Sequence, residues 1–150
     1  FFDDIVGSGT QARQYLSEEL KRIRAGDPNF ELNFLALFAT TEGLRRLNTP
    51  ELFDGRASCL FELDSSFRVF SDNARYFSDS PDWFNATDFQ AMARQYGASL
   101  QPDIPVGYKD GQLLLAFAHN PPDNTLPIFW DQGTRKQWQP IFPRFDKKYA

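Results

Sequence analysis

The sequence predicts an α+β fold in which helices pack on one face of a curved, mainly antiparallel sheet of about five to six strands. Helical patterns lie mainly in the first hundred residues, whereas short apolar segments separated by Gly, Pro, Asp and Asn turns fill residues 104–142. The 150 residues are 41% hydrophobic and 24% charged, as in globular proteins. We therefore expect a single domain over residues 1–150, with a helix-rich N-terminal half and a strand-rich C-terminal half.

Two helices have clear start and stop signals. The first runs from a cap at Thr10 to a glycine stop at Gly26, with basic residues near its end. Its apolar residues recur on one helical face at Leu16, Leu20 and Ile23. The second begins at the cap Asn85, carries Asp88 in its first turn and ends at Gly97.

Residues 29–47 fit two patterns. Phe30, Leu32 and Phe34 alternate as in a strand, but the apolar residues of the same stretch also fit one helical face. We favour a helix for most of 29–47 and keep a strand followed by a short helix as the alternative. Asn48-Thr49-Pro50 ends the segment in either case.

The remaining apolar segments predict antiparallel strands joined by tight turns. "ASCLFELDSSFRVFSD" (57–72) predicts a hairpin around residues 64–66, and "IPVGYKDGQLLLAFA" (104–118) predicts another around Asp110-Gly111. "LPIFW" (126–130) and "KQWQPIF" (136–142) flank a third turn.

The order of predicted elements is similar to two known architectures. One is the nuclear-transport-factor-like cone, whose helices close over a curved sheet and leave a pocket. The other is the PAS-like domain, which "LFELDSSFRVFSDNARYF" (60–77) resembles in its strand, turn, strand and following asparagine. No motif in the chain is specific to either, so the resemblance concerns the fold alone.

Composition excludes several functions. The net charge is −4, and residues 51–100 carry 8 acidic and 4 basic side chains, so no concentrated basic face for nucleic acid is expected. The single cysteine, Cys59, can form neither an internal disulfide nor a zinc site, and no metal or cofactor is predicted. No apolar run approaches the ~20 residues that span a bilayer.

The compartment is left open by the sequence. The chain starts without methionine, so we expect a processed or trimmed form that is soluble and either secreted or cytoplasmic.

His119, the only histidine, is the weak candidate for catalysis. Its ordinary pKa near ~6.5 suits proton transfer, and Asp123 or Asp131 would orient the ring. No GxSxG motif or other marked nucleophile accompanies it. Acidic pairs are the second candidate, namely Glu62 with Asp64 and Asp79 with Asp82, although a solvated surface explains both pairs.

"GSGT" at residues 7–10 precedes the first predicted helix. Its backbone amides would meet an anion at the helix N-terminus. The stretch has no lysine and follows no strong strand signal, so a flexible entry into a capped helix explains it equally well.

Exposed aromatic residues beside basic ones are typical of binding surfaces. Tryptophans in the loop before the second helix and on both sides of the last predicted turn therefore give a candidate surface. Its residues are Trp83, Phe84, Trp130, Arg135, Lys136 and Trp138.

These patterns together favour a non-catalytic domain that binds a protein partner, such as a secreted effector or an immunity or inhibitor protein. The alternative is a domain with a small-molecule pocket, either a sensor or a small hydrolase or isomerase that uses His119 with an aspartate. A deep cavity lined by Phe61, Phe117 and Phe129 would favour the alternative.

Overall fold

The computed structural model describes residues 1–133 and 137–145 and divides the chain into two compact units, Phe1–Asp64 and Ser65–Ala150. Each unit has its own hydrophobic core. In the described part of the chain, no helix is both long and apolar enough to cross a membrane.

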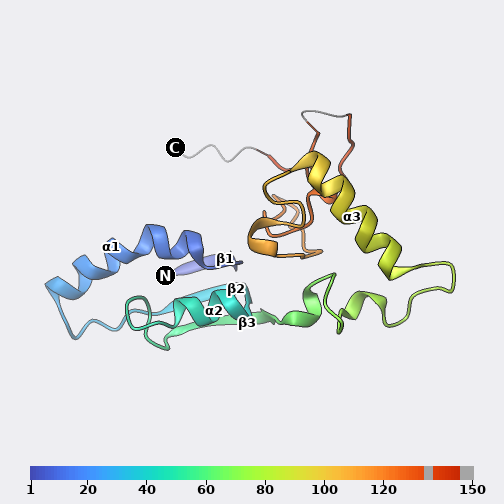
Figure 1. The fold of residues 1–150 in the computed structure, drawn as a ribbon. Helices are drawn as coiled ribbons and strands as arrows, with labels where there is room; N and C mark the ends of the chain where they lie inside the picture. The colour runs from blue at the N-terminus through green and yellow to red at the C-terminus, as the bar shows by residue number, and fades with distance from the viewer. Residues whose placement is uncertain (134–136, 146–150) are drawn as a thin grey trace. The chain divides into compact units, whose positions relative to one another are not determined.

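The first unit is a small parallel α/β structure. It consists of β1 (Phe2–Val6), α1 (Thr10–Gly26), β2 (Phe34–Thr40), α2 (Thr41–Leu47) and β3 (Ala57–Leu63), which run from blue to green in Figure 1. The strands lie in the order β1-β2-β3, and both pairings are parallel. The register places Phe2 beside Leu35 and Phe38 beside Phe61.

Side-chain hydrogen bonds fix where α2 and β3 begin. Thr40 caps α2 by accepting a hydrogen bond from the Gly43 amide at 3.0 Å. Asn48, at the end of α2, pairs with both backbone groups of Ala57 and so fixes the start of β3. Helices and strands meet in one core, in which Leu20, Leu47 and Phe53 are fully buried.

The described residues of the second unit, 65–133 and 137–145, form one α-helix and four short 3₁₀ turns. The helix is α3 (Ala86–Leu100), and the turns are η1 (Ser65–Phe67), η2 (Arg75–Phe77), η3 (Tyr108–Asp110) and η4 (Pro127–Phe129). Asn85 caps α3 by accepting from the amides of Thr87 and Asp88. The core is apolar and includes Val69, Ala93 and Leu126, each fully buried.

The predicted curved antiparallel sheet of five to six strands is wrong. Among the residues that the structure describes, three parallel strands form one open sheet, and all three lie in the first 63 residues. In the described part of the second unit the pairing is limited to an isolated bridge between Leu113 and Thr125. The N-terminal half is therefore the part that holds the strands.

The hairpin predicted at Asp110-Gly111 fails for a stereochemical reason. A two-residue hairpin turn of this kind needs positive φ at both central residues. Positive φ occurs instead at Lys109, Asp110 and Gln112, while Gly111 has φ −63°. The glycine serves close packing, because a Cβ there would overlap the backbone of Asn124.

Segment 29–47 follows the alternative interpretation, a strand and then a short helix. The two helices predicted from caps and glycine stops are present. The cap of α1 is Gly9 rather than Thr10, and α3 continues through Gly97 to Leu100.

Candidate functional site

The loop between β1 and α1, residues 7–9, lies at the carboxyl end of β1 and leads into Thr10, the first residue of α1. Ligands of open parallel sheets bind at this edge, where loops lead from strands into helices. The sequence indicated a possible anion site here but no strand before it. The structure supplies that strand, because "FDDIV" forms β1.

The N-terminus of α1 is open. Gly9 adopts a left-handed conformation, with φ 69°, and no side chain caps the helix. The first helical bond runs from the Arg13 amide to the Gly9 carbonyl at 3.1 Å. The amides just before Arg13 therefore have no partner within the helix, and the helix dipole favours a negative charge beside them.

Two hydroxyl groups line the same loop. The Ser8 hydroxyl donates to the Thr10 hydroxyl at 3.1 Å and accepts a hydrogen bond from the Thr10 amide at 3.4 Å, which leaves the amides of residues 11 and 12 open. Hydroxyls and open amides together form the kind of polar cradle that holds phosphate groups.

Residues at the N-terminus of α2 contact the β1–α1 loop. Thr40 donates its hydroxyl proton to the Gly7 carbonyl at 2.6 Å, while its oxygen accepts from the Gly43 amide. Gly43 lies so close that an added Cβ would overlap the Gly7 carbonyl oxygen and stand 2.9 Å from Val6. Glycine is therefore required at 43 for the loop and α2 to be in contact.

One cation reaches the loop. Arg46, on α2, donates to the Thr10 hydroxyl at 3.0 Å and to the Glu42 carboxylate at 3.1 Å. Glu42 also accepts two bonds from Arg45, at 2.9 and 3.0 Å. The Arg45 hydrogen bond is the main cause that lowers the pKa of Glu42, so this carboxyl stays ionised at neutral pH.

An acidic pair precedes the loop on β1. Asp3 is exposed and Asp4 is partly buried, and their carboxylates accept from the amides of Asp4 at 2.9 Å and Ile5 at 2.8 Å respectively. Successive side chains of a strand point to opposite faces, so the two carboxylates lie on different sides of β1. Among the described residues no group of three or more His, Cys, Asp or Glu is placed to hold a metal ion.

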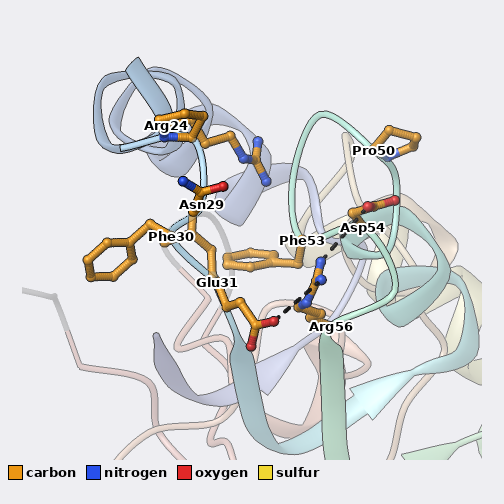
Figure 2. A pocket seen from close by; sticks show the side chains of 10 residues that line it. Arg24, Asn29, Phe30, Glu31, Pro50, Phe53, Asp54 and Arg56 are labelled. Carbon is orange, nitrogen blue, oxygen red and sulfur yellow. Dashed lines mark ion pairs between the residues drawn. The ribbon is translucent and has the colours of Figure 1, made fainter. Parts of the chain in front are cut away.

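A hollow of about 340 Å³ lies at the other edge of the sheet, where the chain enters β2 and β3. Figure 2 shows its floor, Phe53, between two segments of the chain, with Arg56 directed toward Glu31 and Asp54. The Arg56 guanidinium lies 4.0 Å from Glu31 and 3.9 Å from Asp54. Arg24, also on the wall, is bonded to the carbonyls of Glu51 and Leu52. The charged groups of this hollow are thus paired with one another or with the backbone.

The predicted catalytic residues lie in the second unit. His119 is exposed and stacks on Phe117, with ring centres 5.4 Å apart. Asp131 is buried and accepts from Gln101 at 2.5 Å and from the Gly133 amide at 2.6 Å. Asp131 therefore has a structural role, and Asp123 is partly buried. The pairing of His119 with an aspartate stays a prediction.

The predicted binding residues that the structure describes differ in exposure, and their joint surface stays a prediction. Trp130 is buried and donates to the Thr125 carbonyl at 2.8 Å, and Trp138 donates to Ile128 at 3.0 Å. Phe84 packs in an aromatic cluster with Phe77, whereas Trp83 is 83% exposed. Arg135 and Lys136 lie outside the described residues.

The other candidates have ordinary environments. Burial raises the pKa of the Cys59 thiol, which keeps it protonated and makes it a poor nucleophile. Glu62 accepts from the Thr41 hydroxyl at 2.6 Å, and Asp64, Asp79 and Asp82 are exposed.

A family model described as PRTase-CE matches residues 1–144, which is nearly the whole chain. The chain belongs to the PRTase-CE family. This description denotes a phosphoribosyltransferase-like domain. Comparison with curated proteins and with solved structures gave no match.

Membership of the PRTase-CE family corrects the prediction of an effector or immunity protein. The expected antiparallel effector or immunity domain conflicts with both the family and the parallel sheet. Turn chemistry and exposed aromatics led to that prediction, but neither pattern is specific to a function. The predicted protein partner stays a prediction.

Sequence reasoning missed Asp3, Asp4 and Arg46 as functional candidates of this PRTase-CE domain. The sequence "FFDDIVGSGT" did contain a signal for Asp3 and Asp4. In it an acidic pair stands between two apolar pairs, and "GSGT" then leads into the predicted helix. No local signal indicated Arg46, because its contact with Thr10 spans 36 residues of chain.

Proposed function

We propose that the chain is a phosphoribosyltransferase that binds the phosphate of a phosphoribosyl donor at the β1–α1 loop. One observation carries the proposal: a strand with an acidic pair leads through a glycine loop into the uncapped N-terminus of a 17-residue helix. Family membership supports the same reading. The loop supplies the amides, hydroxyls and positive field that a phosphate dianion needs.

Asp3 and Asp4 are assigned to the sugar. Carboxylates near the phosphate loop accept hydrogen bonds from ribose hydroxyls in nucleotide-binding α/β folds, and Asp3 and Asp4 lie on the strand that leads into this loop. Transfer at the ribose C1 also develops positive charge on the ring, which a nearby carboxylate stabilises. In the reaction the bond from C1 to the leaving group breaks, the leaving group keeps the electron pair, and the acceptor's nucleophilic atom bonds to C1.

Calorimetric titration with ribose 5-phosphate, and with ribose as the matched ligand lacking phosphate, tests this proposal. We expect saturable binding of ribose 5-phosphate and much weaker binding of ribose, because the loop contributes only to the phosphorylated sugar. Absence of saturable ribose 5-phosphate binding by the folded chain would contradict the proposed function.

The acidic pair is tested by Asp3→Asn and Asp4→Asn, made separately because the two side chains face opposite sides of β1. At least one should weaken ribose 5-phosphate binding by roughly tenfold while binding of inorganic phosphate is unchanged. Asp27→Asn, at the far end of α1, is the control for loss of one negative charge.

A further inference from the structure

We propose that Arg46 is a phosphate-binding residue, which contacts the donor's phosphate from α2 while the β1–α1 loop holds it from the other side. This inference rests on the proposed function and names a group outside the loop that completes its site. The position of Arg46, the charge around it and its remaining N–H groups support the inference.

The Arg46 side chain lies beside the β1–α1 loop. The aliphatic part of Arg46 packs against Gly9. A Cβ added at Gly9 would lie 3.4 Å from the Cβ of Arg46 and 3.5 Å from the Cδ of Arg46. The guanidinium then reaches the Thr10 hydroxyl at the first residue of α1. The cation is thus held at the end of α1 where the helix amides are open, although it comes from a different helix.

Arg46 belongs to a cluster of two arginines and one glutamate. Glu42 is shared by Arg45 and Arg46, and Arg45 binds it through two nitrogen atoms. One carboxylate therefore faces two guanidinium groups, and the cluster keeps a net positive charge beside the loop. A phosphate dianion at the loop would meet this charge together with the positive end of the helix dipole.

The contacts of Arg46 with Thr10 and Glu42 use only part of its N–H groups. Arg46 uses one N–H toward Thr10 and one toward Glu42, and its guanidinium carries more N–H groups than these two. The side chain is 34% exposed, whereas that of Arg45 is 71% exposed. Arg46 is therefore held in place by protein contacts and still has N–H groups to give to a ligand, as phosphate recognition by arginine requires.

Replacement of Arg46 tests the inference by calorimetry with ribose 5-phosphate and inorganic phosphate. Arg46→Gln should weaken both ligands by roughly tenfold to a hundredfold, since a hydrogen bond to a charged group is lost. Arg46→Lys, which keeps the charge but not the planar fork, should recover part of the affinity. Arg22→Gln, which removes an exposed cation elsewhere on α1, is the control and should bind as the wild type does.

The outcomes separate this inference from the proposed function. Tight ribose 5-phosphate binding by both wild type and Arg46→Gln would overturn the role of Arg46 and leave the loop site intact. Failure of the wild type to bind would overturn both. A purely structural role would lower the melting temperature of Arg46→Gln and Arg46→Lys without a loss of phosphate affinity at a temperature where the variants are folded, which would also overturn the inference.

Discussion

Gly43 shows how closely α2 approaches the β1–α1 loop. The Gly7 carbonyl oxygen occupies the place of its missing side chain, and Val6 borders the same space. Backbone atoms on both sides cannot move away as a flexible side chain would, so this contact is rigid.

Gly43→Ala is therefore expected to destabilise the chain by about 1–3 kcal/mol, the usual cost of forcing a methyl group into a filled space. It should also weaken phosphate binding, because the loop must shift. Gly26→Ala is the matched control, since nothing lies within 4 Å of a Cβ at that position. Equal stabilities of the two variants in urea unfolding would show that the contact is not tight.

At the scale of elements, α2 is a short helix whose polar face is a charge cluster. Hydrogen bonds from Arg45 and then Arg46 lower the pKa of Glu42 below its ordinary value of 4.5. A folded-state pKa below the unfolded one adds stability above the unfolded pKa, and that stability is lost as pH falls through the folded value.

Glu42→Gln should therefore reduce the loss of stability on acidification below pH 4.5. The effect is small because the Glu42 side chain is 50% exposed and solvent screens the pair. Thermal unfolding of wild type and variant between pH 6 and pH 3 measures it. Parallel pH profiles for the two proteins would mean that Glu42 does not contribute.

The sequence predicted β2 only as an alternative to a helix, and it did not predict β1. The sequence "FLALFAT" is a nearly continuous apolar run without alternating polar residues, as is typical of parallel strands, although Leu35 in it is exposed. A run of seven residues fits a helix or a strand equally. Pairing is equally hard to predict, because Phe2 pairs with Leu35 across a whole helix and no turn signal marks the connection.

At the scale of the whole molecule, two cores share the chain. Caps, stripes and glycine stops predicted α1 and α3 because these signals are local. The division into units and the site were less accessible, since both depend on contacts between distant residues such as Arg46 with Thr10. Half of the site, residues 7–10, was visible in the sequence because glycines and hydroxyls before a helix are a local pattern.

Charge also divides between the units. The first 64 residues carry 11 acidic and 7 basic side chains, so the net charge of −4 belongs to the unit with the proposed phosphate site. The proposed anion binding there would depend on the position of Arg46 and on the open amides, not on the overall charge. The composition argument against a basic face was thus compatible with a phosphate site.

Because each unit has its own core, we expect the two to open separately. Leu126→Ala, in the core of the second unit, should accelerate amide hydrogen exchange there and leave β2 protected. Leu20→Ala, in the first core, should do the reverse. Each variant should cost about 2–5 kcal/mol in its own unit. Uniform acceleration across both units by either variant would show that they unfold as one.

The Thr40 hydroxyl joins the Gly7 carbonyl to the Gly43 amide, so the β1–α1 loop and the first turn of α2, which are far apart in sequence, share one contact. A segment tied at its first residue has little conformational freedom left to lose when a ligand arrives. We therefore expect the proposed phosphate loop to keep its conformation when a ligand binds.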